Sequence, residues 1–240
     1  MPTMPMFPLG SVLVPSMVLP LHVFEERYRQ LVRDCLDSTP EFGVVLISRG
    51  SEVGGGDVRT EVGTVARMVE AAELPDGRFN ILLRGEARVR LTELSFVPPF
   101  RRAEAVVVPD EGDEPAERDL LALHSLVNSF TATIRAQNTA FDFQLPPNLP
   151  GSIASNLVAQ HLVLDAGTRQ ELLETLDPSE RVRRVLDVLA LQHSALGKRS
   201  GKSVNLAPGG KPKGRSPRPT RVLQNALSEL SVASPVLEIA

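Results

Sequence analysis

The sequence lacks tryptophan and has only one tyrosine and one cysteine, Cys35. A single cysteine excludes an internal disulfide framework and a zinc site built from several thiolates, and it is typical of a reducing compartment. The shortage of Trp and Tyr disfavours aromatic stacking platforms for single-stranded nucleic acid, although nine Phe remain. We therefore expect a soluble, cytoplasmic protein.

Residues 1–24 contain no charged side chain, yet they do not form a long apolar run. A secretory signal carries a basic region before its apolar run, and a membrane helix needs about 20 apolar residues. Here the first arginine, Arg27, follows the segment, and five prolines interrupt it, namely Pro2, Pro5, Pro8, Pro15 and Pro20. We expect neither a targeting segment nor a membrane span.

Lysine is absent from residues 1–197, where 18 arginines stand against 27 acidic residues. Residues 198–240 hold eight basic and two acidic residues, a net charge of +6. Gly, Pro and Ser dominate 198–221, which predicts a disordered basic linker because so few apolar residues cannot offset the ordering entropy. The linker is either a solvated segment attracted to the acidic body or a polyanion contact. Its candidate contact residues are Lys198, Arg199, Lys202, Lys211, Lys213, Arg215, Arg218 and Arg221.

Short apolar runs separated by Pro and Gly predict about six or seven brief strands within residues 1–112. Two of these strands are expected at 78–85 and 86–94, after a turn at 74–77. One amphipathic helix interrupts the strands, because apolar residues recur at helical spacing from Phe24 to Leu36. This half of the chain is expected to form a small barrel or sandwich.

Residues 113–197 are helical in pattern, with one apolar stripe formed by Leu120, Leu123, Val127, Phe130 and Ile134. Asp177 and Pro178 predict the start of the last helix, with Asp177 as the cap and Glu180 reaching back to it. The fold class is therefore α+β, with the strands first and the helices second.

The order of these elements and two motifs within them resemble the N-terminal substrate-binding domain of Lon proteases. The first motif consists of Phe7, Pro8, Leu9, Pro20, Leu21, Phe24, Glu25, Arg27 and Tyr28. The second consists of Gly63, Thr64, Asp76, Gly77, Gly85 and Arg88. The resemblance covers about residues 5–195 and implies a PUA-like small β-barrel with an inserted helix, followed by an α-helical bundle.

The resemblance also implies a non-catalytic module that binds polypeptide, as an adaptor or a regulator of proteolysis. Its partners would be unfolded or peptide segments of other proteins, and a protease. A Walker motif is missing, because residues 197–203 place three residues between the glycines where four are needed. A Ser–Lys dyad is not expected either, since the body has no lysine. We expect no enzyme activity and no cofactor.

The alternative function is a nucleic-acid contact, made by the barrel or by the basic tail, and a small enzyme of unknown type comes third. The four histidines show no metal-binding spacing and are expected to be structural. They are His22, His124, His161 and His193. Cys35 falls on the inward face of the first helix, which predicts a buried thiol with a raised pKa.

The C-terminal segment, residues 222–240, is apolar again. Helical spacing predicts a short helix over 222–231, and Leu237 and Ile239 belong to a second apolar patch after Pro235. An isolated helix of this length is marginal in water. We therefore expect 222–231 to dock on an apolar groove, either of its own body or of a partner.

Overall fold

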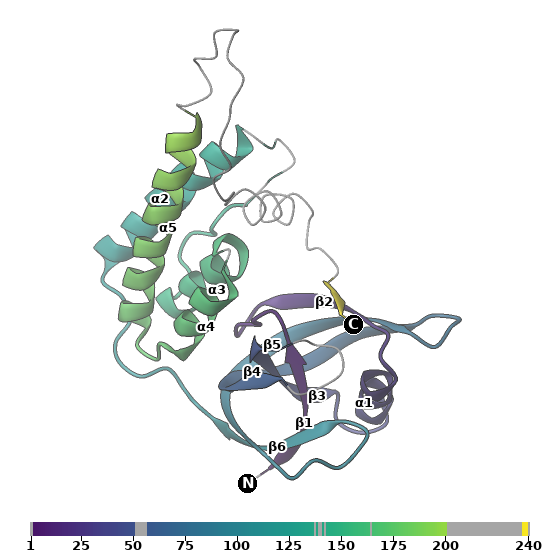
Figure 1. Cartoon of the computed structure of the whole chain (residues 1–240). Coiled ribbons are helices and arrows are strands. Elements are labelled where there is room, and N and C mark those ends of the chain that lie inside the picture. Colours follow the sequence, from purple (N-terminus) through teal and green to yellow (C-terminus); the bar gives the residue numbers. More distant parts are fainter. Residues whose placement is uncertain are drawn as a thin grey trace, which may run out of the picture.

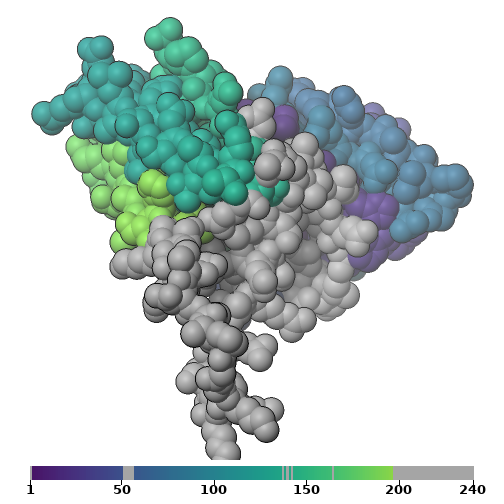
Figure 2. Space-filling model, turned by 90° about the horizontal axis from the view of Figure 1, so that it is seen from above, coloured from purple at the N-terminus to yellow at the C-terminus, as the bar shows by residue number. Residues whose placement is uncertain are grey.

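The strands and the helices gather in two lobes of one molecule (Figure 1; Figure 2), as a computed structural model of the chain shows. Helix α1 (Glu26–Leu36) lies against the barrel of strands, and the other helices form the second lobe. The structure describes residues 2–50, 57–136, 138, 141, 143–163 and 165–200, and the backbone of 237–239. The predicted helix at 222–231 lies outside these residues.

The barrel closes because its two longest strands pair with each other. The sheet runs in the order β4-β3-β1-β6-β5-β2-β7, and the additional pairing of β4 with β5 joins the first strand to the fifth. The ring thus contains five strands, and β2 continues the sheet beyond it. The strands are β1 (Thr3–Leu9), β2 (Val18–Val23), β3 (Glu41–Arg49), β4 (Val58–Glu73), β5 (Phe79–Glu93), β6 (Arg101–Val107) and β7 (Leu237–Ile239).

The expectation of separate strands at 78–85 and 86–94 is wrong, since β5 is continuous through Gly85. Gly85 stays in the strand because its amide donates to the Met17 carbonyl and its carbonyl accepts from the Ser16 amide, both at 2.8 Å. A Cβ at this position would lie 2.5 Å from the Val14 carbonyl oxygen. A glycine is therefore required here because two backbone segments approach each other closely, and not because the chain turns.

Other residues of the second motif also build the barrel. A Cβ at Gly63 would lie 2.2 Å from the Val44 carbonyl oxygen of the neighbouring strand. The buried hydroxyl of Thr64 donates to the Leu13 carbonyl at 2.7 Å. Gly77 has a φ of 80° in the turn between β4 and β5, a backbone conformation that favours glycine.

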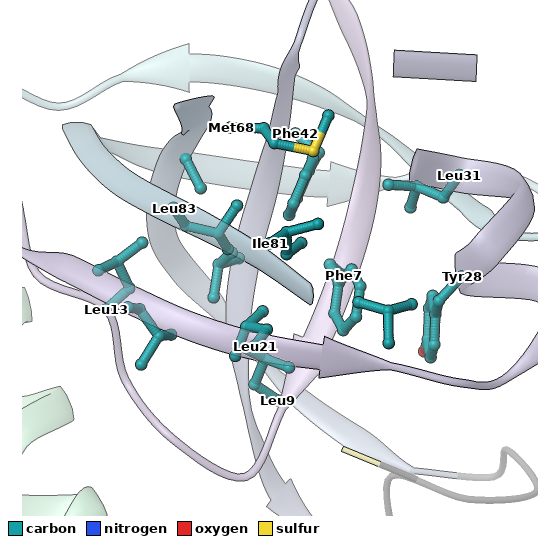
Figure 3. Close-up of a cluster of buried hydrophobic side chains, with 14 of the residues drawn as sticks. Phe7, Leu9, Leu13, Leu21, Tyr28, Leu31, Phe42, Met68, Ile81 and Leu83 are labelled. Carbon is teal, nitrogen blue, oxygen red and sulfur yellow. The ribbon is translucent and has the colours of Figure 1, made fainter. Parts of the chain in front are cut away.

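Helix α1 covers an opening of the barrel with Tyr28, Leu31, Val32 and Cys35. The ring of Tyr28 stacks on that of Phe7 with 4.2 Å between centroids, and Figure 3 shows both beside Leu31. Burial raises the pKa of the Tyr28 phenol to about 12 and that of the Cys35 thiol to about 11, because a low-dielectric surrounding disfavours the anions. The prediction that Cys35 is a buried thiol with a raised pKa is confirmed.

Polar contacts of Arg27 fix the start of α1. Arg27 Nε donates to Glu25 Oε2 at 2.8 Å, and Arg27 Nη2 donates to Glu25 Oε1 at 3.3 Å. The guanidinium also lies 4.5 Å from the centre of the Tyr28 ring. Arg27 thus connects Glu25, the residue before the helix, to the aromatic ring of Tyr28.

The second lobe has its own apolar core, built on the predicted stripe of α2. Asp177 caps the last helix, since its Oδ1 accepts from the Ser179 amide at 2.8 Å. Glu180 does not reach back to the cap as predicted; it pairs with Arg183 and Arg184 at 3.0 Å instead. The helices are α2 (Glu117–Arg135), α3 (Gly151–Leu162), α4 (Ala166–Glu174) and α5 (Pro178–Ser200).

A cluster of charges around two buried arginines joins the two lobes. The carboxylate of Asp110, after β6, accepts from Arg88 Nη1 at 2.8 Å and from Arg181 Nη1 and Nη2 at 2.9 and 2.7 Å. Arg181 is completely buried, and its Nε donates to the Ser155 hydroxyl of α3 at 3.1 Å. Arg88, from β5, is also buried and donates to the Leu173 carbonyl of α4.

Burial of the Asp110 carboxyl acts to raise its pKa, but the hydrogen bonds from Arg181 and Arg88 outweigh this effect and hold the pKa below its usual range. Its folded pKa therefore lies below the unfolded value of about 3.9. The resulting stabilisation is complete at neutral pH and is lost as the pH falls from about 4 through the folded pKa.

Replacing Asp110→Asn should lower the free energy of unfolding at pH 7 by about 3–5 kcal/mol, because two buried guanidinium groups lose their carboxylate. Urea unfolding followed by circular dichroism measures this loss at pH 7 and again at pH 3, where the difference from the wild type should shrink. The control is Asp113→Asn at an exposed carboxylate three residues on. A loss no larger than the control's would contradict the account of the joint.

Replacing Arg27→Ala should lower the melting temperature by about 2–4 °C, since a partly exposed ion pair and a cation–π contact together contribute about 1 kcal/mol. Polypeptide binding by the folded fraction should be unchanged. Arg118→Ala, at a side chain that is 88% exposed, is the matched control. An Arg27→Ala variant of full stability that lost binding would assign Arg27 to a ligand site.

Candidate functional site

Only two of the eight basic residues that the sequence offers as a polyanion contact belong to the part of the chain that the structure describes. Lys198 and Arg199 lie in α5, because this helix ends at Ser200 and not at residue 197, where the helical half was expected to end. The remaining six lie outside the described residues, namely Lys202, Lys211, Lys213, Arg215, Arg218 and Arg221. Their role stays a prediction.

The exposed strand β2 is the candidate functional element that the fold creates. Its side chains alternate, with Leu19, Leu21 and Val23 buried in the barrel core and Val18 45% exposed. One edge of β2 pairs with residues 79–84 of β5. The other edge lies outside the ring of five strands, where the sheet can add a strand, and β7 pairs with it over Leu21–Val23.

A pocket of about 490 Å³ opens beside the end of β2. It lies between this strand, the start of α1 and the turn that connects β4 to β5. The aromatic ring of Phe24 supplies apolar surface, since the residue is 37% exposed. The lining residues are His22, Phe24, Arg29, Asp76 and Arg78.

Hydrogen bonds hold the polar lining of this pocket in place. Arg29 Nε donates to the Gly77 carbonyl at 2.6 Å and so ties α1 to the turn. His22 Nδ1 lies 2.7 Å from Asn80 Oδ1, and Arg78 Nη1 lies 3.1 Å from His22 Nε2. These partners fit an imidazole with its proton on Nδ1, because an amide oxygen accepts and a guanidinium donates.

The charges of the pocket balance one another. Arg78 pairs with Asp76 at 2.7 Å, and its hydrogen bonds hold the pKa of the Asp76 carboxyl below the usual range. Arg29 pairs with Glu26 at 2.9 Å. A pocket with paired charges and one aromatic ring suits a polypeptide, which presents both apolar and polar groups, better than a polyanion.

The described part of the chain contains neither a cluster of metal-ligating side chains nor an exposed cysteine. There, no group of three His, Cys, Asp or Glu side chains is placed to hold a metal ion. The Cys35 thiol is buried, and burial raises its pKa to about 11, which lowers the fraction of thiolate at neutral pH. Across the same residues, no helix is both long and apolar enough to cross a membrane.

Sequence reasoning missed the edge of β2 and the pocket. His22 was expected to be an ordinary structural histidine, and Arg29 drew no attention. The available signal was Pro20, since a proline inside a strand marks an edge of a sheet. The first motif contains Pro20 and Phe24, so it includes residues of the exposed strand and of the pocket.

Comparison with known proteins supports the resemblance seen in the sequence. The family model of the ATP-dependent protease La (LON) substrate-binding domain matches residues 3–190. Lon protease 2 of Herpetosiphon aurantiacus is 28% identical over 79% of this chain and 25% of its own length. The Lon protease of Roseiflexus castenholzii is 30% identical over 80% of this chain and 24% of its own. The chain thus spans about a quarter of these curated relatives.

Solved structures confirm the predicted α+β fold. The crystal structure of the Lon N-terminal domain protein from Xanthomonas campestris matches with a TM-score of 0.59 and 29% identity, over 78% of this chain and 98% of that one. The N-terminal domain of Mycobacterium avium complex Lon protease matches with a TM-score of 0.58 over 79% and 98% of the two chains, and its 17% identity supports the fold alone. Because the family model also covers both lobes, the chain belongs to the family of ATP-dependent protease La (LON) substrate-binding domains.

Proposed function

We propose that this protein is a non-catalytic module that binds unfolded or extended segments of other proteins, as an adaptor or a regulator of proteolysis. The observation that carries the proposal is the match of the substrate-binding domain family to residues 3–190, which include the barrel, α1 and the helical lobe. Its partners are then polypeptide segments and a protease that receives them. Its single buried cysteine fits the cytoplasm.

The geometry of the barrel supports polypeptide rather than nucleic acid as the ligand. Phosphate binding needs basic side chains that release counterions when they meet the ligand. On the barrel, many arginines already pair with carboxylates, among them Arg59, Arg67, Arg78, Arg84 and Arg101. The edge of β2 instead offers backbone groups, which pair with any extended chain regardless of its sequence.

A nucleic-acid contact remains the alternative, and its source is the +6 charge of residues 198–240. Basic residues on such a tail give weak binding that is indifferent to sequence. This contact would coexist with a polypeptide site on the body, since the two use different parts of the chain.

Binding measured at 50 and 200 mM salt distinguishes the two ligands. A labelled, permanently unfolded polypeptide of near-zero net charge should bind with a dissociation constant that changes less than about threefold, because it releases few counterions. A single-stranded DNA 20-mer should bind weakly and lose affinity steeply, with a slope of at most about 0.7 per basic residue engaged. Fluorescence anisotropy measures both.

The control is a variant with Lys211, Lys213, Arg215 and Arg218 all replaced by Ser. It should lose DNA binding and keep polypeptide binding. Tight DNA binding that survives these substitutions, together with no polypeptide binding, would overturn the proposed function and favour the barrel as a nucleic-acid site.

A further inference from the structure

The C-terminal strand β7 lies along the outer edge of β2, where Figure 1 shows it in yellow beside the C-terminus. The two strands run parallel. Their register pairs Leu21 with Leu237, His22 with Glu238, and Val23 with Ile239. The chain therefore contains a segment that already uses the exposed edge described above.

The outer edge of β2 lies outside the ring because β5 pairs with two different strands on the same side. Residues 79–84 of β5 pair with β2, whereas residues 89–93 pair with β6 on the same side. Strand β2 therefore lies outside the closed ring, and the edge that faces away from β5 can pair with another strand. In a closed barrel no edge remains, so this projecting strand is the place where the sheet can grow.

Local sequence limits the length of this edge. Pro20 has no backbone N–H to donate, so pairing on its outer side begins at Leu21. Helix α1 begins at Glu26, shortly after β2 ends at Val23. The three paired positions thus fill the usable edge between the proline and the helix, and a ligand that joins there meets the pocket at His22 and Phe24.

We propose that the Leu21–Val23 edge of β2 is a binding site for an extended polypeptide segment, which joins the sheet in the parallel direction, and that residues 237–239 are its internal occupant. This inference rests on the proposed function and specifies its site. Main-chain hydrogen bonds supply sequence-tolerant affinity, and the neighbouring pocket selects the flanking side chains. The protein is then self-inhibited until an external segment displaces β7.

Tethering gives the internal strand its advantage. A covalently linked segment acts at an effective concentration of about millimolar, well above that of a free ligand in dilute solution. If residues 237–239 occupied the edge in about nine of ten molecules, the apparent affinity for an external segment would be about tenfold weaker. A ligand with several contacts overcomes this competition more readily than a short peptide.

Two variants of the full chain release the edge. Ile239→Pro removes a backbone N–H that faces β2, because the outward-facing His22 bonds in a parallel ladder to the residues on either side of its register partner Glu238. A second variant lacks residues 237–240. Ala233→Pro, which introduces the same residue before the paired positions, is the matched control. Hydrogen exchange should be faster at one or more amides of Leu21–Val23 in the two released variants than in the wild type and the control.

The probe for the site is a labelled peptide with the sequence of residues 231–240, SVASPVLEIA. By fluorescence anisotropy it should bind both released variants at least about fivefold more tightly than the wild type or the control, because the internal competitor is gone. Adding the peptide should restore slow exchange at Leu21–Val23. A permanently unfolded polypeptide of near-zero net charge should show the same gain in affinity.

Three results would overturn the proposal, and they separate it from the function on which it rests. Equal affinities in all four proteins, with polypeptide binding present, would place the site elsewhere and leave the proposed function standing. Absence of polypeptide binding in every protein would refute both. Protection that appears only on the helical lobe when the peptide binds would also rule out the β2 edge.

Discussion

The carboxylate of Asp110 is the contact on which the arrangement of the molecule depends, because it binds two buried guanidinium groups from different lobes. Arg88 belongs to the barrel and Arg181 to the last helix, and each also bonds to the backbone of the segment around α4. An unpaired buried charge is energetically costly, so the guanidinium groups of both arginines must stay in contact with the Asp110 carboxylate. This requirement fixes how the helical lobe sits on the barrel.

The barrel that this joint supports leaves one strand outside its ring. Apolar contacts strengthen the frame, since Leu173 of α4 packs with the barrel core and Leu157 of α3 contacts both cores. Strand β2 is held on its inner side by this core and by β5, and its outer edge and the pocket beside it are thereby presented on a rigid support. A rigid edge binds an extended segment without first having to order itself.

The sequence predicts the helices and strands better than it predicts the contacts between them. Alternation and helical spacing identify most strands and the stripe of α2, because these depend on neighbours along the chain. The continuity of β5 through Gly85 was missed, since it depends on the backbone of residues 14–17. The pairing of Asp110 with Arg181 joins residues 71 positions apart, and the position of β2 outside the ring depends on strand order. Neither feature produces a pattern in the neighbouring sequence. Pro20 is the one residue that indicates an edge strand.

Photo-cross-linking tests most directly the claim that polypeptide binds at the exposed edge of this barrel. An unfolded polypeptide carrying benzophenone groups is irradiated with the full chain and with the variant that lacks residues 237–240, and mass spectrometry locates the adducts. The account predicts adducts within residues 18–24 and 76–80, more abundant in the shortened variant. Adducts confined to the helical lobe or to residues 198–221 would contradict it.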